Sequence, residues 1–298
     1  MHLNQYMGNI LNKYNGQEIN ILYQPQNNLF DILISQLPFN FFIISENGSG
    51  SLDNISIIHP NDTNLYQFTL SLTNNILSYT KDKRFNQLGL NTIVFTHSEK
   101  PQHIKKEDLY LMDKNINSTN KIFFSEYAKN TWKFSNRSDV IKYGIPSNIF
   151  FVNQDIKREN KLLLLNLERR NIDLLASILS QNNIPFDIVT DLTKDIADTF
   201  NKYTVCLEMN EHNIINLICA NACGCYGISP NTPMLLSDFN NLNIKFLNNI
   251  ELIIQEIKQL LDNPPEINSD MVKSYDFESF SQYLINLIVS TNKEVCLV

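Results

Sequence analysis

The 298-residue chain lacks the marks of several protein classes. No apolar run approaches the roughly 18 residues that a membrane-spanning helix requires, and the polar N-terminus has no basic region followed by an apolar core, as a secretory signal would. The patterns G-x-x-x-x-G-K-S/T, G-x-G-x-x-G and G-x-S-x-G are absent, so P-loop, dinucleotide-oxidoreductase and serine-hydrolase readings lose their main support. We therefore expect a soluble, cytoplasmic protein of another class.

Cysteine and positive charge are also scarce. Only five cysteines occur, and four of them crowd into residues 206–225, which fits a reducing compartment better than a disulfide framework. Cys219 and Cys223 fall one helical turn apart with no matching His pair, so no metal site is expected. The net charge of −7 argues against bulk nucleic-acid binding, although a local basic groove stays open. Abundant Asn, Ile and Lys suggest an AT-rich bacterial or viral genome, hence the host cytoplasm if viral.

What the chain has in plenty is apolar sequence, since 43% of its residues are hydrophobic. That is enough for two cores and two domains of roughly 140 residues each. In the first half we expect helices over Leu65 to Tyr79 and over Glu126 to Phe134. Strands are expected at Ile19 to Tyr23, Phe41 to Ser45, Ile55 to His59, Ile93 to His97, Lys121 to Ser125 and Val140 to Tyr143.

A second series of alternating runs begins after Gly144-Ile145-Pro146. Strands are expected at Lys161 to Leu167, Phe186 to Thr190, Tyr203 to Leu207, Cys225 to Ser229 and Ile244 to Leu247. Helices are expected at Asn171 to Gln181, around Ile196, and at Asn249 to Leu261. Apolar strands separated by helix-length segments predict an α/β protein with two Rossmann-like, doubly wound parallel sheets.

The stretch Glu208 to Pro233, EMNEHNIINLICANACGCYGISPNTP, joins a polar start, an apolar helix, a glycine stop and a small-residue strand. We expect Asn210 to cap the helix, Glu211 to lie in its first turn and Gly224 to end it. The following strand should be tightly packed and buried. This succession is typical of a ligand-binding helix end.

The same stretch resembles the donor-binding segment of GT-B glycosyltransferases, the retaining branch that includes sucrose synthase and lipopolysaccharide enzymes (glycosyl transferases group 1). The family pattern is Glu, seven residues, Glu-Ala-Met-Ala-Cys-Gly and then an apolar strand. Glu211 fits the first Glu and Ala220-Asn221-Ala222-Cys223-Gly224 fits the tail. Cys219 stands in place of the second Glu, which in the family usually holds the nucleotide ribose. This difference from the family pattern therefore affects the residues expected to bind the nucleotide.

The resemblance extends by pattern over most of residues 90 to 290. Lys121 to Ser125 and Tyr143 to Pro146 fill the places of the family's strand-Ser-helix unit and interdomain turn. The resemblance implies an N-terminal acceptor-side domain of residues 1–146 and a nucleotide-sugar-binding domain of residues 147–270 facing it across a cleft. It also implies a C-terminal helix within 271–298 that crosses back to the first domain.

Site residues follow from the resemblance and from position. Arg169 and Arg170, after the strand that ends at Leu167, are candidates for the donor diphosphate; the alternative is a solvated basic pair. Glu211 would contact the donor sugar or serve only as a helix-dipole acid. Further donor-binding candidates are His212 and Asn213 in the same turn, Glu208 at the strand end, and Cys219.

Two histidines end strands of the first half, where an α/β sheet faces its ligand. His97 resembles the family's interdomain His and is the catalytic candidate beside Glu211, whereas a structural histidine is the alternative for it and for His59. Ser125 is expected to cap a helix. Trp132 is expected in the core.

These residues together predict a metal-independent hexosyltransferase that retains anomeric configuration. A nucleotide-sugar, with a UDP-sugar as first expectation, would be the co-substrate, and no other cofactor is expected. The acceptor would be a glycan, a lipid-linked intermediate or a protein, with DNA less favoured because of the acidic charge. The alternatives are a GT-B-like binding or scaffold protein without turnover and an epimerase of the same fold.

Overall fold

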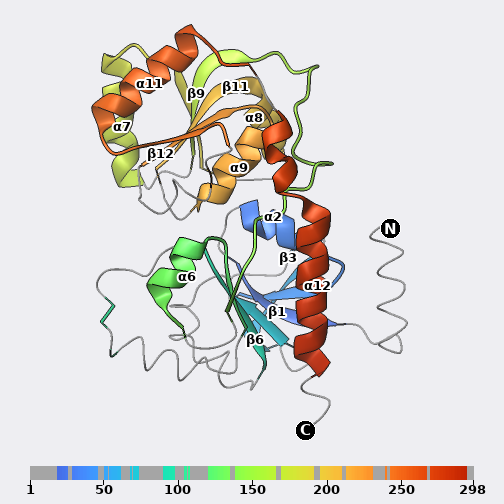
Figure 1. Cartoon of the computed structure of the whole chain (residues 1–298). Helices are drawn as coiled ribbons and strands as arrows, with labels where there is room; N and C mark the ends of the chain where they lie inside the picture. The colour runs from blue at the N-terminus through green and yellow to red at the C-terminus, as the bar shows by residue number, and fades with distance from the viewer. Residues whose placement is uncertain are drawn as a thin grey trace. The chain divides into compact units, whose positions relative to one another are not determined.

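The computed structural model describes residues 19–25, 29–45, 50–52, 54–61, 68, 70–73, 90–97, 104–105, 107, 120–134, 138–165, 169–190, 195–209, 213–230, 239, 242–266 and 269–293. The chain divides into two compact units (Figure 1). The first contains Met1–Gln26, Phe30–Lys142 and Glu278–Val298, and the second contains Asn27–Leu29 and Tyr143–Phe277. Both ends of the chain therefore belong to the first unit.

The first unit contains a sheet of strand order β3-β4-β2-β1-β5-β6-β7-β8, in which only the β3–β4 pair is antiparallel. Its described elements are β1 (Asn20–Gln24), α2 (Leu29–Ser35), β2 (Asn40–Ile44), β3 (Gly50–Leu52), β4 (Ile55–Ile58), β5 (Leu70–Thr73), β6 (Thr92–Thr96), β7 (Asn120–Phe123), α6 (Glu126–Trp132), β8 (Ser138–Val140) and α12 (Phe277–Lys293). The strand order reverses between β1 and β5, as in a doubly wound sheet.

Phe30 of α2 is the centre of an aromatic core in this unit. Its ring meets those of Phe95 and Phe124 edge-on, at centroid distances of 5.0 and 5.4 Å. It also meets Phe280 of α12 edge-on at 6.3 Å. Aromatic pairs favour such edge-to-face geometry, so these contacts fix α2 and α12 against the strands.

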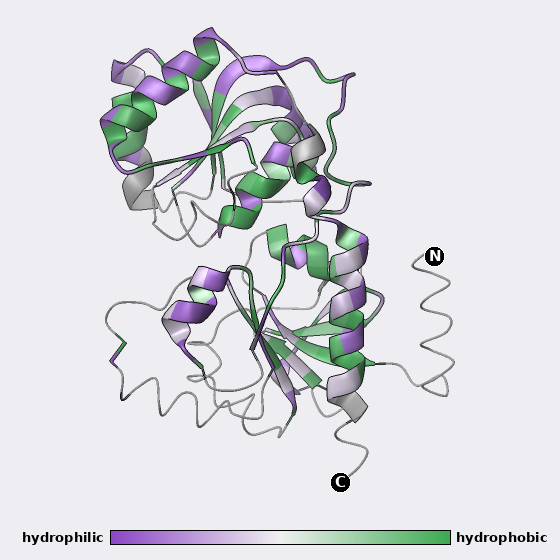
Figure 2. Ribbon diagram, viewed as in Figure 1, coloured by the Kyte–Doolittle hydropathy of each residue, from purple (hydrophilic) through white to green (hydrophobic). Residues whose placement is uncertain are grey.

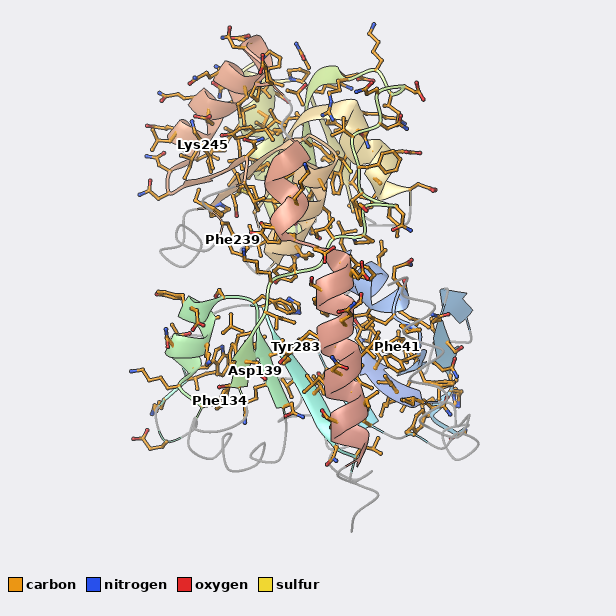
Figure 3. All side chains as sticks on the ribbon, turned by 45° about the vertical axis from the view of Figure 1, so that its right-hand side comes forward. Phe41, Phe134, Asp139, Phe239, Lys245 and Tyr283 are labelled. Carbon is orange, nitrogen blue, oxygen red and sulfur yellow. The ribbon has the colours of Figure 1, made fainter. Side chains whose placement is uncertain are left out.

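Helix α12 comes last in the sequence but packs on the first unit. Its Tyr283 hydroxyl donates a hydrogen bond of 2.8 Å to the Asp139 carboxylate next to it (Figure 3). Near the other end of the helix, Asn120 Nδ2 donates to Thr291 Oγ1 at 2.8 Å. The paired residues are 144 positions apart in sequence in one bond and 171 in the other. The last helix of the chain therefore completes the fold of the first unit.

The prediction of one helix in this unit is wrong. The segment from Leu65 to Tyr79 was predicted helical, but Leu70–Thr73 forms β5, hydrogen bonded between β1 and β6. The expected strands at 19–23, 41–45, 55–59, 93–97 and 121–125 match β1, β2, β4, β6 and β7 to within a residue or two, and the last expected strand overlaps β8 at Val140. The helix expected at 126–134 is α6. Short β3 was not predicted.

The second unit contains a fully parallel sheet of strand order β10-β9-β11-β12-β13. Its described elements are β9 (Glu159–Leu165), α7 (Arg169–Gln181), β10 (Phe186–Val189), α8 (Ile196–Lys202), β11 (Tyr203–Glu208), α9 (Ile214–Ala222), β12 (Tyr226–Pro230), β13 (Ile244–Leu247), α11 (Ile250–Asp262) and the 3-10 helix η3 (Ser269–Ser274). All five strands were expected from the sequence.

Helices α7 and α11 cover one face of this sheet, and α8 and α9 lie on the other side (Figure 1). Leu175 and Leu179 of α7 and Ile257 of α11 pack on Leu162 and Val205 of the strands. Helix α11 carries both hydrophobic and hydrophilic residues, as an amphipathic helix should (Figure 2). Asn249 caps it by accepting a hydrogen bond from the Glu251 amide at 2.7 Å.

All nine residues of α9 are buried, and the chain leaves this helix through a tight, small-residue turn. Gly224 adopts a positive φ of 80°, which a side chain would oppose. Asn221 then holds the turn: its Nδ2 donates to the carbonyls of Cys225 and Asn243, and its Oδ1 accepts from the Asn243 amide, each at 3.1 Å. The predicted glycine stop and buried strand are confirmed.

Candidate functional site

The second unit gathers its candidate site residues at the carboxyl edge of its sheet. The strand order reverses between β9 and β11, and ligands of open α/β sheets bind outside the strand ends at such a point. Leu165, the last residue of β9, is the register partner of Glu208, the last residue of β11. The segments that follow these two strands therefore start side by side.

Glu208 is the most unusual residue at this edge because its side chain is 0% exposed. Its Oε2 accepts a hydrogen bond of 2.8 Å from Nδ2 of Asn216, which lies in α9 and is also 0% exposed. The other amide atom of that side chain, Asn216 Oδ1, is buried and has no hydrogen-bond partner among the described residues. Two acceptor groups thus lie together in a region where polar groups are costly to desolvate.

The described part of α9 begins at Ile214, and Asn213 occupies its N-cap position without a side-chain capping hydrogen bond. Asn213 is half-buried. Asn210, the expected cap, lies outside the described residues, as do Glu211 and His212. The expected cap and the place of Glu211 in the first turn therefore stay predictions.

The two arginines fall on the same edge as Glu208. Arg169 and Arg170 are the first two residues of α7, which follows β9. Their side chains lie outside the described residues. Backbone amides at the N-terminus of a helix favour anions, so the position of this pair agrees with a phosphate-binding role, which stays a prediction.

Cys219 occupies the middle of α9 and is 0% exposed. Burial, and then the nearby Cys223, raise the pKa of its thiol well above the ordinary value, so the group is neutral. Tyr143, where the chain enters this unit, is buried nearby, and burial raises the pKa of its hydroxyl, with smaller contributions from Tyr275 and Cys219. The thiol is therefore part of a packed interior, and a role in donor binding stays untested.

His97 lies in the first unit directly after β6, at the end of a strand as predicted. Its ring stacks on Phe124 at a centroid distance of 4.7 Å and meets Phe30 edge-on at 4.7 Å. Only 7% of the residue is exposed. These contacts hold the imidazole in one orientation, which suits a structural role and a positioned catalytic group equally.

Three further expectations concern the first unit. Ser125 caps α6, because its Oγ accepts from the Ala128 amide at 3.0 Å, which confirms the predicted cap. Trp132 is 3% exposed and stacks on Phe134 at 5.5 Å, which confirms it as a core residue. His59 accepts a hydrogen bond from the Asn61 amide at 3.2 Å and sits in a local turn.

Within the described part of the chain, no group of three or more His, Cys, Asp or Glu residues is placed to hold a metal ion. No helix within those ranges has the length and apolar character needed to cross a membrane.

Asn216 is the site residue that sequence reasoning missed. It lies within the run Ile214 to Ala222, whose apolar residues dominate the pattern. The available signal was an Asn inside an otherwise apolar, fully buried helix, since a buried amide requires polar partners. Glu208, eight residues earlier in sequence, supplies one.

Comparison with models of protein families found no match, and a search of curated proteins found none. Solved structures, in contrast, are similar in fold. Sucrose-phosphate synthase from Thermosynechococcus elongatus aligns with a TM-score of 0.64 at 11% identity, covering 91% of this chain and 98% of that chain.

Two other solved structures are similar. HepE of Anabaena, in complex with UDP, aligns with a TM-score of 0.60 at 9% identity, covering 92% of this chain and 100% of that chain. AviGT4, a glycosyltransferase involved in avilamycin A biosynthesis, aligns at 0.60 and 9%, covering 93% and 98%. At these identities the likeness shows the fold, and the prediction of two doubly wound α/β units of the GT-B type is confirmed.

Proposed function

We propose that this chain is a glycosyltransferase that moves a hexose from a nucleotide-sugar to an acceptor hydroxyl. The observation that carries the proposal is the buried Glu208–Asn216 pair, at the point where the strand order of the second unit reverses. A carboxylate and an amide oxygen in that place accept hydrogen bonds from hydroxyl groups, which a nucleotide-sugar presents in number. The GT-B fold of the chain, shared with a UDP complex and with sugar-transferring enzymes, supports the same assignment.

In this proposal the second unit binds the donor. Arg169 and Arg170, with the N-terminus of α7, neutralise the diphosphate as the glycosidic bond breaks, so the reaction needs no metal ion. Glu211 contacts the transferred sugar, and Glu208 with Asn216 accepts from donor hydroxyls. His97 of the first unit is the proposed catalytic histidine. Retention of configuration and a UDP-sugar as donor follow from the family resemblance.

The first experiment is a thermal-shift screen of the purified chain against UDP, GDP, ADP, CMP and their sugar conjugates. We expect a rise of several degrees with one nucleotide and a larger rise with its sugar conjugate, because a ligand that binds only the folded state stabilises it. Hydrolysis or transfer is then followed with that donor, with and without EDTA, and the anomeric configuration of the product is read by NMR. A product of inverted configuration, or activity lost in EDTA, contradicts the corresponding part of the proposal.

Variants separate binding from folding. Glu208→Gln keeps the size of the side chain and removes the buried charge, so the melting temperature without ligand should stay the same or rise. Donor affinity should fall by about ten- to a hundredfold, since hydrogen bonds to a charged acceptor are worth roughly 1.5–3 kcal/mol. Glu256→Gln is the matched control, because Glu256 lies on α11, away from this edge, and accepts a hydrogen bond from Lys245 of β13.

The same screen distinguishes a transferase from the two alternatives, a protein without turnover and an epimerase. No shift with any nucleotide or sugar conjugate would favour a binding or scaffold protein without turnover. In that case the buried Cys219, where the family carries a Glu, is the first residue to change. A donor that binds and is converted without release of a transferred sugar would point to an epimerase.

A further inference from the structure

The side-chain amide of Asn216 has two ends in different surroundings. Its Nδ2 donates a hydrogen bond of 2.8 Å to Glu208 Oε2, and the residue is 0% exposed. Its Oδ1 is buried as well, and the described part of the chain offers this atom no hydrogen-bond partner. A buried acceptor without a partner destabilises a folded protein, so folding gains nothing from this oxygen.

Glu208 fixes the orientation of the amide. An ionised carboxylate only accepts hydrogen bonds, so the amide nitrogen must point toward it and the amide oxygen away from it. A flipped amide would place Asn216 Oδ1 against Glu208 Oε2, and two acceptors repel each other at hydrogen-bond distance. The carboxylate therefore holds Asn216 with its accepting end turned to the other side.

Two other buried asparagines of the second unit have both ends of the amide bonded. Asn201 donates to the Phe151 carbonyl at 3.0 Å and accepts from the Asn153 amide at 2.8 Å. Asn221 both donates and accepts in the turn after α9. Each of them is 2% exposed. The fold thus satisfies these amides completely and leaves the oxygen of Asn216 without a partner.

The three asparagines also differ in their place along the sheet. Asn201 and Asn221 belong to the last turns of α8 and α9, which lead into the amino ends of β11 and β12. Asn216 lies near the start of the described part of α9, after the carboxyl end of β11, where the strand order reverses. A ligand of an open α/β sheet binds at that edge. The unpaired oxygen is therefore the one at the candidate site.

We propose that Asn216 Oδ1 accepts a hydrogen bond from a hydroxyl of the bound nucleotide-sugar, on its hexose or on its ribose, and that the chain therefore prefers donors with this hydroxyl to their deoxy forms. Glu208 is the positioning residue of this contact, because it holds the amide in the accepting orientation. The inference rests on the proposed function for the identity of the ligand. An amide oxygen has no proton to donate, so it distinguishes a hydroxyl from a group that only accepts.

The test uses analogues that lose one hydrogen-bond donor at a time. The probe is whichever of UDP-glucose, GDP-mannose and ADP-glucose raises the melting temperature most, with its deoxyfluoro analogues at each hydroxyl of the hexose and the ribose. Fluorine keeps a small polar atom in place and cannot donate. Dissociation constants are measured by isothermal titration calorimetry. In the wild type, one analogue should bind about three- to tenfold more weakly than the parent, the effect of one lost hydrogen bond.

The ratio of these two dissociation constants is then compared between variants. In Asn216→Leu parent and analogue should bind equally. In Glu208→Gln the ratio should shrink, because a neutral amide can donate to Asn216 as well as accept from it and no longer fixes its orientation. Asn182→Leu is the control and should keep the wild-type ratio, because Asn182 lies in the turn after α7 and its amide bonds Ile178 and Lys258. A merely structural role would weaken parent and analogue alike.

Each outcome decides the inference. A wild-type ratio in Asn216→Leu shows that the oxygen does not contact the ligand and overturns the inference, whereas sugar transfer by the wild type leaves the proposed function standing. If Asn216→Leu does not fold, an unchanged ratio in Glu208→Gln overturns it instead. Binding that depends on Asn216 in a chain that transfers no sugar supports the inference and contradicts the transferase. If no nucleotide-sugar binds, both are wrong.

Discussion

Asp187 on β10 accepts two hydrogen bonds, one from a residue of β9 and one from a residue of β11. Lys161 Nζ donates at 2.8 Å and the Tyr203 hydroxyl at 2.6 Å. The bond from Lys161 and then that from Tyr203 lower the pKa of the Asp187 carboxyl below its ordinary value of 3.8. For the same reason, the bond to Asp187 raises the pKa of Lys161. The three residues join β9, β10 and β11 at the partly exposed edge of the second unit.

The variant Asp187→Asn should therefore make the free energy of unfolding less dependent on pH in the acid range. A carboxyl whose pKa is lower in the folded state stabilises the protein above its unfolded pKa, and this contribution is lost as pH falls through the folded pKa. Wild type should exceed the variant in urea midpoint at pH 6, and the difference should begin to shrink as pH falls through the unfolded value near 3.9. The two proteins should converge only below the folded pKa, which lies lower. Asp155→Asn, on an exposed turn, is the control. A constant difference at every pH would contradict the linkage.

The residues of the candidate site differ in whether the sequence alone could predict them. Glu208 could be identified from sequence because it ends an apolar strand and a charged residue there stands out. Asn216 could not, because its role depends on a carboxylate eight positions away that the fold brings to 2.8 Å.

At the scale of elements, β12 shows how closely α9 and the strands approach. A Cβ added to Gly227 would lie 2.9 Å from Cγ1 of Ile244 on β13 and 3.4 Å from Cβ of Leu217 on α9. The first distance is shorter than van der Waals contact allows. A glycine is therefore required where β12 passes between its neighbours.

Gly227→Ala should lower the free energy of unfolding by about 1–3 kcal/mol, as overpacking does. Ile244→Ala alone should cost about 2–4 kcal/mol by creating a cavity. Because it removes the Cγ1 atom that the new methyl meets, the double variant should lose less than the sum of the two single losses. Urea unfolding of the four proteins measures the coupling, and strictly additive losses would show that the close approach has no energetic consequence.

The elements that were predicted correctly have a hydrophobic pattern that fits only one kind of secondary structure. The run Leu162 to Leu165 is apolar throughout, as a strand buried on both faces should be. The failure at Leu65 to Tyr79 has the opposite cause. Leu65, Phe68 and Leu72 fit a helical spacing, while Phe68, Leu70 and Leu72 alternate as in a strand. Pairing of β5 with β1 and β6 decides between them, and no local pattern contains that information.

At the scale of the whole molecule, the first unit needs both ends of the chain. Phe280, Tyr283 and Thr291 of α12 contact α2, Asp139 and Asn120. The second unit is inserted between these parts, and its entry and exit lie together: the Ile145 amide donates to the Tyr275 carbonyl at 2.8 Å. Residues 143–277 therefore form a closed insertion.

A fragment of residues 143–277 should fold alone, whereas a fragment of residues 1–142 should not. Removing α12 exposes the apolar surface that Phe280 and Leu284 cover, and both are nearly fully buried. A synthetic peptide of residues 277–298 added to the 1–142 fragment should restore cooperative thermal unfolding measured by circular dichroism. The same peptide with Leu284→Asp should not. Cooperative unfolding of residues 1–142 without the peptide would contradict the prediction.

The return of α12 to the first unit also sets the order in which the molecule is finished during synthesis. The ribosome releases residues 143–277 before α12 has emerged, so the second unit can reach its native state while the first still waits for its last helix. The part of the chain made first is thus completed last. Until α12 has emerged, the aromatic core around Phe30 stays uncovered on the side of Phe280 and can make unwanted contacts with other chains.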